Sequence, residues 1–222
     1  MNKIDILNKK IIKCKKCPRL VNYIQKVAKE KVKRFSDETY WGRPLTGFGD
    51  FDARVLIVGL APAAHGGNRT GRMFTGDSSG DWLAKALYEN GFATKPSSQR
   101  IVDGFKLVDT YVTASVRCAP PDNKPSRTEL DNCLQYLNEE FKILKNIKII
   151  ICLGRIAFDS TCNILKIKGR RFSHGNSFEH NNLIVLCSYH PSRQNTQTGR
   201  LSWEQWSSIF SHARKIIGKA PR

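Results

Sequence analysis

The amino-acid sequence predicts an α/β fold, a three-layer α/β/α arrangement around a central, mainly parallel sheet. Short uninterrupted apolar runs, such as residues 55–59, are typical of strands buried on both faces of a sheet. Between them lie longer segments whose apolar residues recur every three to four positions, as in amphipathic helices. This alternation predicts helices on both faces of a parallel sheet. The 222 residues, 40% of them hydrophobic, suit a single domain over residues 1–222.

The N-terminal part of the chain supplies the first elements of this fold. Ile4, Leu7 and Ile11 fall on one face of a first helix, and residues 20–28 repeat the pattern after the break at Cys17-Pro18. Residues 40–51 are rich in glycine and aromatic side chains and are predicted to form a loop. Residues 55–59, Val-Leu-Ile-Val-Gly, are predicted to form the first buried strand, so the core begins there.

The rest of the chain alternates between helix and strand. The sequence predicts helices over 81–90, 126–145, 156–165 and 203–217, and strands over 111–116, 148–153 and 183–187. Ser126 with Glu129, and Ser202 with Gln205, have the spacing of capping boxes, which fixes where two helices begin. Open α/β sheets bind ligands at the carboxyl ends of their strands. In this sequence four loops follow those strand ends: 60–77, 117–125, 154–155 and 188–200.

The charge of the chain indicates a polyanionic partner. Its formal net charge is +18 and its pI is about 9.8. A basic helical element over residues 1–35 should lie near phosphates, because its first 34 residues hold twelve Lys or Arg against Asp5 and Glu30. A basic surface that only keeps the protein soluble is the alternative. The sequence shows no membrane-spanning run and no signal-peptide core, so we expect a soluble, cytoplasmic protein.

Seven cysteines in a chain without an export signal indicate metal ligation or buried thiols rather than disulfides. Cys14 and Cys17 form one pair, and Cys118 and Cys133, with fourteen residues between them, form another. Four thiolates suit a 4Fe-4S cluster or a structural zinc, and the wide second spacing favours the cluster. The alternative is that all seven are simply buried thiols. We leave out of the metal site the three cysteines inside apolar strands and helices, Cys152, Cys162 and Cys187.

Four segments together resemble the motifs of the uracil-DNA glycosylase superfamily, and among its branches the likeness is closest to family 5, the type-5 enzymes. They are residues 59–66 (GLAPAAHG), 72–77 (RMFTGD), 117–124 (RCAPPDNK) and 190–200 (HPSRQNTQTGR). The resemblance implies an α/β/α fold whose N-terminal helical element carries part of a structural 4Fe-4S site. Its ligands would be Cys14, Cys17, Cys118 and Cys133.

The resemblance also implies an activity. A monomeric enzyme of this kind flips a deaminated base out of double-stranded or single-stranded DNA and hydrolyses its bond to deoxyribose, without a lyase step. Phe74 resembles the aromatic residue that stacks on the flipped base, and His190 matches the donor to the departing base. Asp77 would orient water or stabilise the cationic sugar. Asn123 would be the second polar group that the family implicates in the reaction. The alternative roles are structural. Phe74 would be a core aromatic and His190 a cap on the final loop, while Asp77 would be a helix N-cap and Asn123 a turn residue.

The residues at the family's pocket positions predict an enzyme with a broad substrate range, which prefers uracil but also removes hypoxanthine and xanthine. Ala61 stands where the best-known branch has its carboxylate, and Ala63 replaces a tyrosine of that branch. Gly66 falls where family 4 has a glutamate, and Ala114 where stricter enzymes place an asparagine that reads uracil. His65 should help to shape the first loop. The alternative for Ala114 is strand packing.

The last motif resembles the loop that enters DNA and fills the gap left by the flipped base. Its polar residues can also bind phosphates: Ser192, Arg193, Gln194, Asn195 and Arg200. Two other functions stay open from the residues alone. One is a family 4 enzyme restricted to uracil, and the other is a non-catalytic iron-sulfur or zinc protein that binds nucleic acid.

Overall fold

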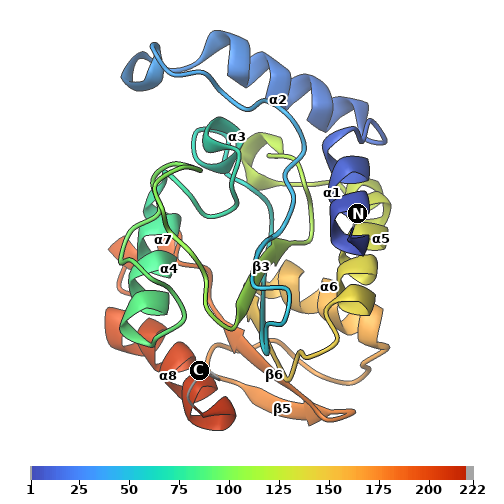
Figure 1. Cartoon of the computed structure of the whole chain (residues 1–222), viewed down its shortest axis with the longest axis vertical. Helices are drawn as coiled ribbons and strands as arrows, with labels where there is room; N and C mark the ends of the chain where they lie inside the picture. The colour runs from blue at the N-terminus through green and yellow to red at the C-terminus, as the bar shows by residue number, and fades with distance from the viewer. Residues whose placement is uncertain (1, 219–222) are drawn as a thin grey trace.

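A twisted sheet lies at the centre of the molecule (Figure 1), and the computed structural model describes residues 2–218. Within that range the sheet has six strands in the order β1-β3-β2-β4-β6-β5. Neighbours from β3 to β6 run parallel, and the two edge strands are antiparallel to theirs. The strands are β1 (Phe48–Gly49), β2 (Val55–Gly59), β3 (Thr110–Ala114), β4 (Ile149–Leu153), β5 (Ser177–His180) and β6 (Leu183–Ser188). The predicted, mainly parallel sheet is confirmed.

Helices cover both faces of this sheet. In the part described they are α1 (Lys3–Ile12), α2 (Pro18–Glu30), α3 (Gly67–Thr70), α4 (Ser78–Glu89), α5 (Arg127–Ile143), α6 (Arg155–Leu165), α7 (Arg193–Gln197) and α8 (Trp203–Ile217), with short 3-10 turns at Lys33–Phe35 and Pro121–Asn123. Figure 1 shows α4 and α8 on one side of the sheet, α1, α5 and α6 on the other, and α2 beyond its upper end.

Alternating strand residues divide the core into two halves. Val55 and Ile57 of β2 pack with α4 and α8, where Trp206 and Phe210 are completely buried. Leu56 and Val58 point to the opposite face and pack with α1, α5 and α6. Because both of their faces are covered, β2 and β4 consist of uninterrupted apolar residues. The three-layer α/β/α arrangement is therefore confirmed.

A buried ion pair ties the end of β3 to α5. The Arg117 guanidinium lies 2.6 Å from Glu140, and the two side chains are 1% and 0% exposed. Thr113 donates its hydroxyl proton to the same carboxylate at 2.6 Å and accepts from Arg117. A buried charge is tolerated only when it is paired in this way. The pair fixes the start of the loop that follows β3.

Several short elements were not expected from the sequence. The prediction of a loop over residues 40–51 is wrong in part, because β1 adds a two-residue edge strand there. Gly49 permits this pairing, since it has a φ of +136° and a Cβ there would lie 2.3 Å from the carbonyl oxygen of Thr110. The short helices α3 and α7 and the edge strand β5 also lie in segments without a clear periodicity.

The predicted helix starts are confirmed where capping chemistry supported them. Ser126 and Ser202 both form complete capping boxes, with Glu129 and Gln205 respectively. The helix predicted over 81–90 begins earlier, at Ser78, because Asp77 caps it. Among the described residues, no helix has the length and apolar character needed to cross a lipid bilayer.

Candidate active site

A cavity of about 610 Å³ opens at the carboxyl edge of the sheet. The loop after β2, the turn before α4, the loop after β3 and the segments after β4 and β6 all contribute to its wall. It brings together nine of the residues singled out from the sequence: Ala61, Ala63, Phe74, Asp77, Asn123, His190, Ser192, Arg193 and Gln194. These residues lie far apart in the chain, so the fold and not local sequence assembles the site.

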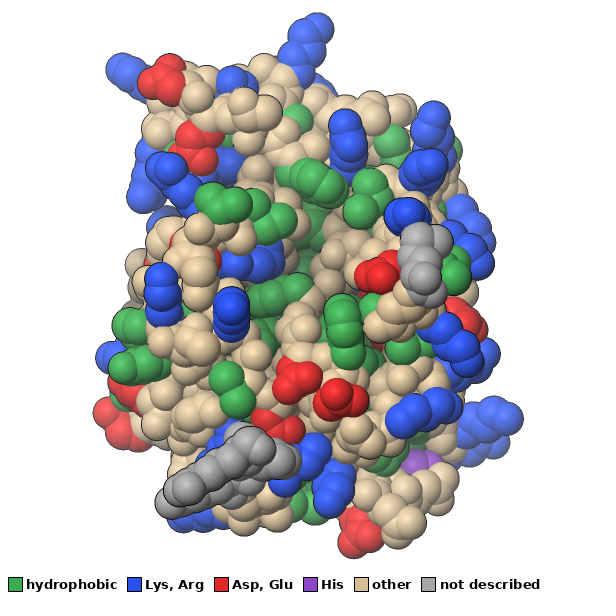
Figure 2. Space-filling model, viewed as in Figure 1, with side chains coloured by type: hydrophobic (Ala, Val, Ile, Leu, Met, Phe, Trp, Pro, Cys, Tyr) green, Lys and Arg blue, Asp and Glu red, His purple; other side chains and the backbone are tan. Residues whose placement is uncertain are grey.

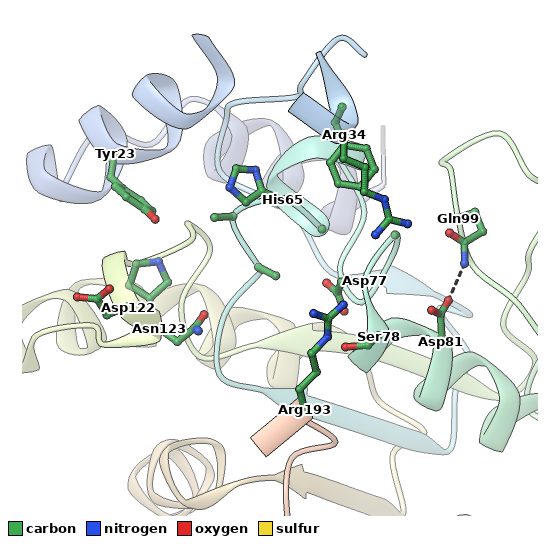
Figure 3. A pocket seen from close by; sticks show the side chains of 16 residues that line it. Tyr23, Arg34, His65, Asp77, Ser78, Asp81, Gln99, Asp122, Asn123 and Arg193 are labelled. Atoms are coloured by element: carbon green, nitrogen blue, oxygen red, sulfur yellow. Dashed lines mark hydrogen bonds between the residues drawn. The ribbon is translucent and has the colours of Figure 1, made fainter. Parts of the chain in front are cut away.

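A second cavity, of about 550 Å³, adjoins the first and shares part of its wall. The shared residues include Ala63, Asp77 and Asn123, and His65 and Gly66 line only the second cavity. Figure 3 shows this cavity with Tyr23 of α2 on one side and Gln99 on the other, while Arg193 reaches from α7 toward the turn that carries Asp77. Asp77 therefore lies at the junction of two hollows.

Asp77 is both a helix cap and a cavity residue. Its Oδ1 accepts the backbone N–H of Gly80 at 2.9 Å, so the N-cap interpretation is correct. Its other oxygen lies against Gly66, where a Cβ would come within 1.9 Å of it. Burial raises the pKa of Asp77, while hydrogen bonds from the Gly80 and Ser79 backbone act in the opposite direction. Such a carboxylate is held in one position with little water around it.

Phe74 and His190 form one wall of the first cavity. Their ring centroids lie 5.8 Å apart at an interplanar angle of 34°. Gly59 leaves space for the Phe74 ring, because a Cβ there would come 2.7 Å from Cζ of Phe74. Burial lowers the pKa of His190 to about 4, so its imidazole is neutral near pH 7 and offers one N–H. The carbonyl of His190 accepts from the Asn195 amide at 2.8 Å, which holds the loop after β6 in place.

Asn123 reaches both cavities from a turn with unusual backbone geometry. Asp122 and Asn123 have φ values of 53° and 56°, so two consecutive residues adopt the left-handed conformation. Asn and Asp tolerate it better than other non-glycine residues, but the turn is still strained. Both side chains are exposed and line both cavities. Sequence reasoning missed Asp122 although it lies inside the quoted motif, since nothing in its pattern separated it from a turn residue.

His65 belongs to the framework of the second cavity. Its Nδ1 lies 3.0 Å from the hydroxyl of Tyr40, and its carbonyl accepts from Arg69 at 2.8 Å. Burial, helped by the nearby Arg69 charge, lowers the pKa of His65. These contacts tie the first loop to Tyr40 and Arg69.

Three expected site residues line neither cavity: Ala114, Asn195 and Arg200. Ala114 is completely buried in the core next to α4 and α8, so its side chain packs β3 instead of lining the pocket. Alternation along β3 explains this, because Ala114 shares a face with Val112. The guanidinium of Arg200 lies 4.4 Å from the Tyr189 ring centroid, and Asn195 supports the backbone of His190.

The four expected ligand cysteines lie in one region. Cys17, Cys118 and Cys133 pack in a small apolar cluster, and Cys14 lies just before Cys17 on the segment between α1 and α2. Burial raises the pKa of Cys133 to about 11, and the nearby thiols of Cys17 and Cys14 contribute in the same direction. Among residues 2–218, no three histidine, cysteine or carboxylate side chains are grouped so that they could hold a single metal ion.

The other cysteines behave as expected. Cys152 and Cys187 are completely buried and face each other on β4 and β6. Burial raises the pKa of Cys187 to about 12 and that of Cys162 to about 11. These thiols are packing residues of the core.

Basic side chains border the site on the N-terminal side. Figure 2 shows Lys and Arg side chains along the margin of the molecule that α1 and α2 form. Arg34, just after α2, and Arg193 of α7 line the second cavity. The surface beside the cavities is thus suited to phosphates.

Comparison with known proteins identifies the family. The family model "Uracil DNA glycosylase superfamily" matches residues 46–213. The chain is 42% identical to the type-5 uracil-DNA glycosylase of Pyrobaculum aerophilum, covering 96% of this chain and 93% of the relative. It is 43% identical to that of Mycobacterium leprae, covering 97% and 96%, and 44% identical to that of Thermus thermophilus, covering 92% and 94%. The chain therefore belongs to the uracil-DNA glycosylase superfamily, and within it to the type-5 family.

Proposed function

We propose that this chain is a monofunctional uracil-DNA glycosylase of base excision repair, which hydrolyses the bond between a damaged base and deoxyribose. The observation that carries this proposal is the first cavity, where Phe74, Asp77, Asn123 and His190 meet at the carboxyl edge of the sheet. Its volume of about 610 Å³ is in the range of small-ligand pockets and can enclose one nucleotide.

Base flipping requires a compensating contact inside the cavity. Extruding a nucleotide from a duplex costs a few kcal/mol in lost pairing and stacking. The Phe74 ring, which lies beside His190 and over Gly59, offers a flat apolar surface on which the base can stack. One such contact contributes about 1–3 kcal/mol. The positive φ of Phe74, 48°, shows that the fold holds this ring against a backbone preference.

His190 and Asp77 suit the two ends of the breaking bond. Bond cleavage leaves negative charge on the base and positive charge on the sugar. A neutral His190 donates its N–H to the base oxygen without first having to lose or gain a proton, since its pKa lies near 4. Asp77 supplies the negative charge that stabilises the sugar cation or orients the attacking water. Its cap on α4 keeps the carboxylate at the junction of the cavities.

The turn at Asp122 and Asn123 contributes to the wall of both cavities. Asn123 offers both a donor and an acceptor to a water molecule or to the nucleotide. Its exposed side chain reaches both cavities. We assign Asn123 the role of positioning water together with Asp77.

The substrate range extends beyond uracil to hypoxanthine and xanthine. Ala61 and Ala63 contribute only methyl groups to the cavity wall, and the hollow continues past Ala63 into the second cavity. This part of the wall holds no fixed polar group, so it discriminates weakly between bases, because no partner is left unpaired by the wrong one. Ala114 is buried in the apolar cluster against which Phe74 packs, so its side chain lies behind the cavity wall.

Four cysteines suit a structural 4Fe-4S cluster. In such a cluster each thiolate binds a different iron atom, so its ligands stand farther apart than those of one ion. The four cysteines, Cys14, Cys17, Cys118 and Cys133, fit this requirement, because they come from the α1–α2 segment, the loop after β3 and α5. They are also near enough to one another that the charges of neighbouring thiolates in this set raise the pKa of both Cys118 and Cys133. When bound, the cluster supplies covalent links between these segments. Iron and sulfide analysis of anaerobically purified protein tests this assignment against zinc.

The compartment, the oligomeric state and the form of the DNA substrate belong to the same proposed function. We assign the chain to the cytoplasm, as a monomer that acts on double-stranded and single-stranded DNA. Its seven free cysteines suit a reducing compartment. Size-exclusion chromatography with light scattering tests the oligomeric state.

A base-release assay tests the function. The purified protein is incubated with duplexes that carry uracil, hypoxanthine or xanthine, and abasic sites are counted. We expect release of all three, with uracil fastest. Release of uracil alone supports the family 4 behaviour and contradicts the broad substrate range. If no base is released from any substrate, a non-catalytic nucleic-acid-binding protein is the better description.

A further inference from the structure

Two apolar side chains protrude beside the second cavity. Ile101 and Val102 are 57% and 86% exposed, which makes them the most exposed large hydrophobic residues in the part of the chain that the structure describes. They are adjacent at the tip of the loop that connects α4 to β3. Because they are adjacent, they form a contiguous exposed apolar patch, and such patches mark interaction sites.

One carboxylate, that of Asp103, organises the turn at the base of this tip. Asp103 accepts the backbone N–H groups of Gln99, Arg100 and Phe105 at 2.8, 3.0 and 2.9 Å. The buried guanidinium of Arg72 binds both oxygens of Asp103, at 2.9 and 2.8 Å. Burial by itself would raise the pKa of Asp103, but these hydrogen bonds outweigh it and hold the pKa well below its ordinary value. The apolar tip is therefore presented on a preorganised turn.

The same loop is bonded to the segment that carries Phe74 and Asp77. Ser98 shares a hydrogen bond of 2.7 Å with the Thr75 hydroxyl, and its carbonyl accepts the Gly76 N–H at 3.0 Å. The Gln99 amide donates to Asp81 of α4 at 2.6 Å, and both side chains line the second cavity (Figure 3). The tip thus stands a few residues from the cavity wall and is continuous with it.

We propose that Ile101 and Val102 form an apolar wedge that packs against the bases of duplex DNA beside the flipped nucleotide. This inference rests on the proposed function and adds a contact outside the 193–200 loop. The surroundings favour DNA over a protein partner, because Arg100 in the same loop and Arg34 at the second cavity are exposed cations. The whole chain carries +18. Apolar side chains that enter a base step lower the energy needed to unstack it.

The wedge has a consequence that a structural loop would not have. A duplex must be unstacked before a base leaves it, whereas an unpaired strand needs little unstacking. Loss of the wedge should therefore slow release from duplex DNA and leave release from single strands unchanged. A loop that only supported the Phe74–Asp77 segment would affect both substrates equally.

The test compares the double variant Ile101→Ser/Val102→Ser with unmodified protein. Single-turnover release of uracil is measured from a duplex and from the same strand unpaired. We expect the duplex rate to fall roughly tenfold or more, equivalent to about 1.4 kcal/mol, with the single-strand rate unchanged. Ile216→Ser is the matched control, because Ile216 is an exposed apolar residue of α8 (38%) that lines neither cavity, and its change should alter neither rate.

A binding readout separates this inference from the proposed function. A 2-aminopurine placed beside the uracil brightens when it is unstacked, so its emission should rise with unmodified protein and not with the double variant. Equal duplex rates for both proteins, or equal losses on both substrates, overturn the wedge. If unmodified protein releases no base at all, the proposed activity is wrong, and the 2-aminopurine signal still decides for or against the wedge.

Discussion

Gly66→Ala should disable the site by displacing Asp77. A Cβ on Gly66 would lie 1.9 Å from Oδ2 of Asp77 and 2.8 Å from its Cγ. The carboxylate must retreat by about 1.5 Å to reach an ordinary contact distance, since carbon and oxygen atoms approach to roughly 3.4 Å. It cannot do so and keep the 2.9 Å hydrogen bond to Gly80 unchanged.

The expected losses differ between activity and stability. A misplacement of about 1 Å in a catalytic group lowers the rate by roughly a hundredfold. Weakening the N-cap of α4 costs about 1 kcal/mol of unfolding free energy. For a chain of this size that lowers Tm by about 2–4 °C. The variant should therefore remain folded while its single-turnover excision of uracil falls by about two orders of magnitude.

Gly67→Ala is the matched control for this prediction. A Cβ there would be crowded as well, 2.9 Å from Cβ of Pro62 and 3.1 Å from Cδ2 of Leu45, but it would not touch Asp77. It should lose stability and keep its excision rate. In an Asp77→Ala background, Gly66→Ala should have no further effect on the rate. Full activity in Gly66→Ala would refute the reasoning, because the position of Asp77 would then not matter.

The catalytic pair, the buried histidine, the cysteines and the basic helices can each be tested separately. Asp77→Asn and His190→Ala should each lower single-turnover excision by on the order of a hundredfold while DNA affinity, measured by fluorescence anisotropy, changes little; an unmodified rate in Asp77→Asn would move the water-positioning role to Asn123. Burial lowers the pKa of His190 from 6.5 to about 4, so the unfolded chain binds more protons in that interval and the free energy of unfolding decreases as pH falls from 6.5 to 4. His190→Gln should flatten this slope in thermal melts at stepped pH, and an unchanged slope would contradict the burial argument. Cys118→Ala should lower iron content and Tm more than Cys152→Ala, which removes only core packing; equal losses would count against the cluster. Affinity for DNA should fall steeply with salt, and Lys→Ala changes between Lys9 and Lys33 should reduce the slope of log K against log salt by about 0.9 for each phosphate that the variant no longer neutralises; an unchanged slope would place the DNA elsewhere.

The long elements could be predicted from the sequence because each carries a strong local signal. Central strands such as Ile149–Leu153 are continuous apolar runs, and α5 and α8 begin at capping boxes. The edge strand β1 has two residues, and α3 and α7 have four and five, so none spans enough residues to show a period. Their conformation is set by contacts with distant segments.

The residue types of the site could be predicted from the sequence, but which of their side chains face the cavity and which contact one another could not. Asp77, His190 and Phe74 lie together because motifs after different strands converge at one edge. Ala114 was expected to line the pocket but lies buried on the α4–α8 side of β3, and a motif position alone does not tell which way a strand residue faces. Gly66 was interpreted as an enlarged opening, whereas its close contact with Asp77 gives it a second role. That contact joins residues of two different motifs, and no local pattern encodes it.

The buried pair of Arg117 and Glu140 restricts how this sequence can drift. Replacing one partner alone leaves a bare charge in the core and costs about 3–5 kcal/mol, a large part of the stability of an ordinary domain. A single substitution at either position therefore gives a protein that folds poorly, so the two residues change as a pair or stay as they are. Since Arg117 directly precedes Cys118 and the loop to Asn123, the register of that loop is inherited with the pair. New substrate ranges can then arise by changes in the cavity wall, such as at Ala61 or Ala63, without disturbing the segment that anchors the site.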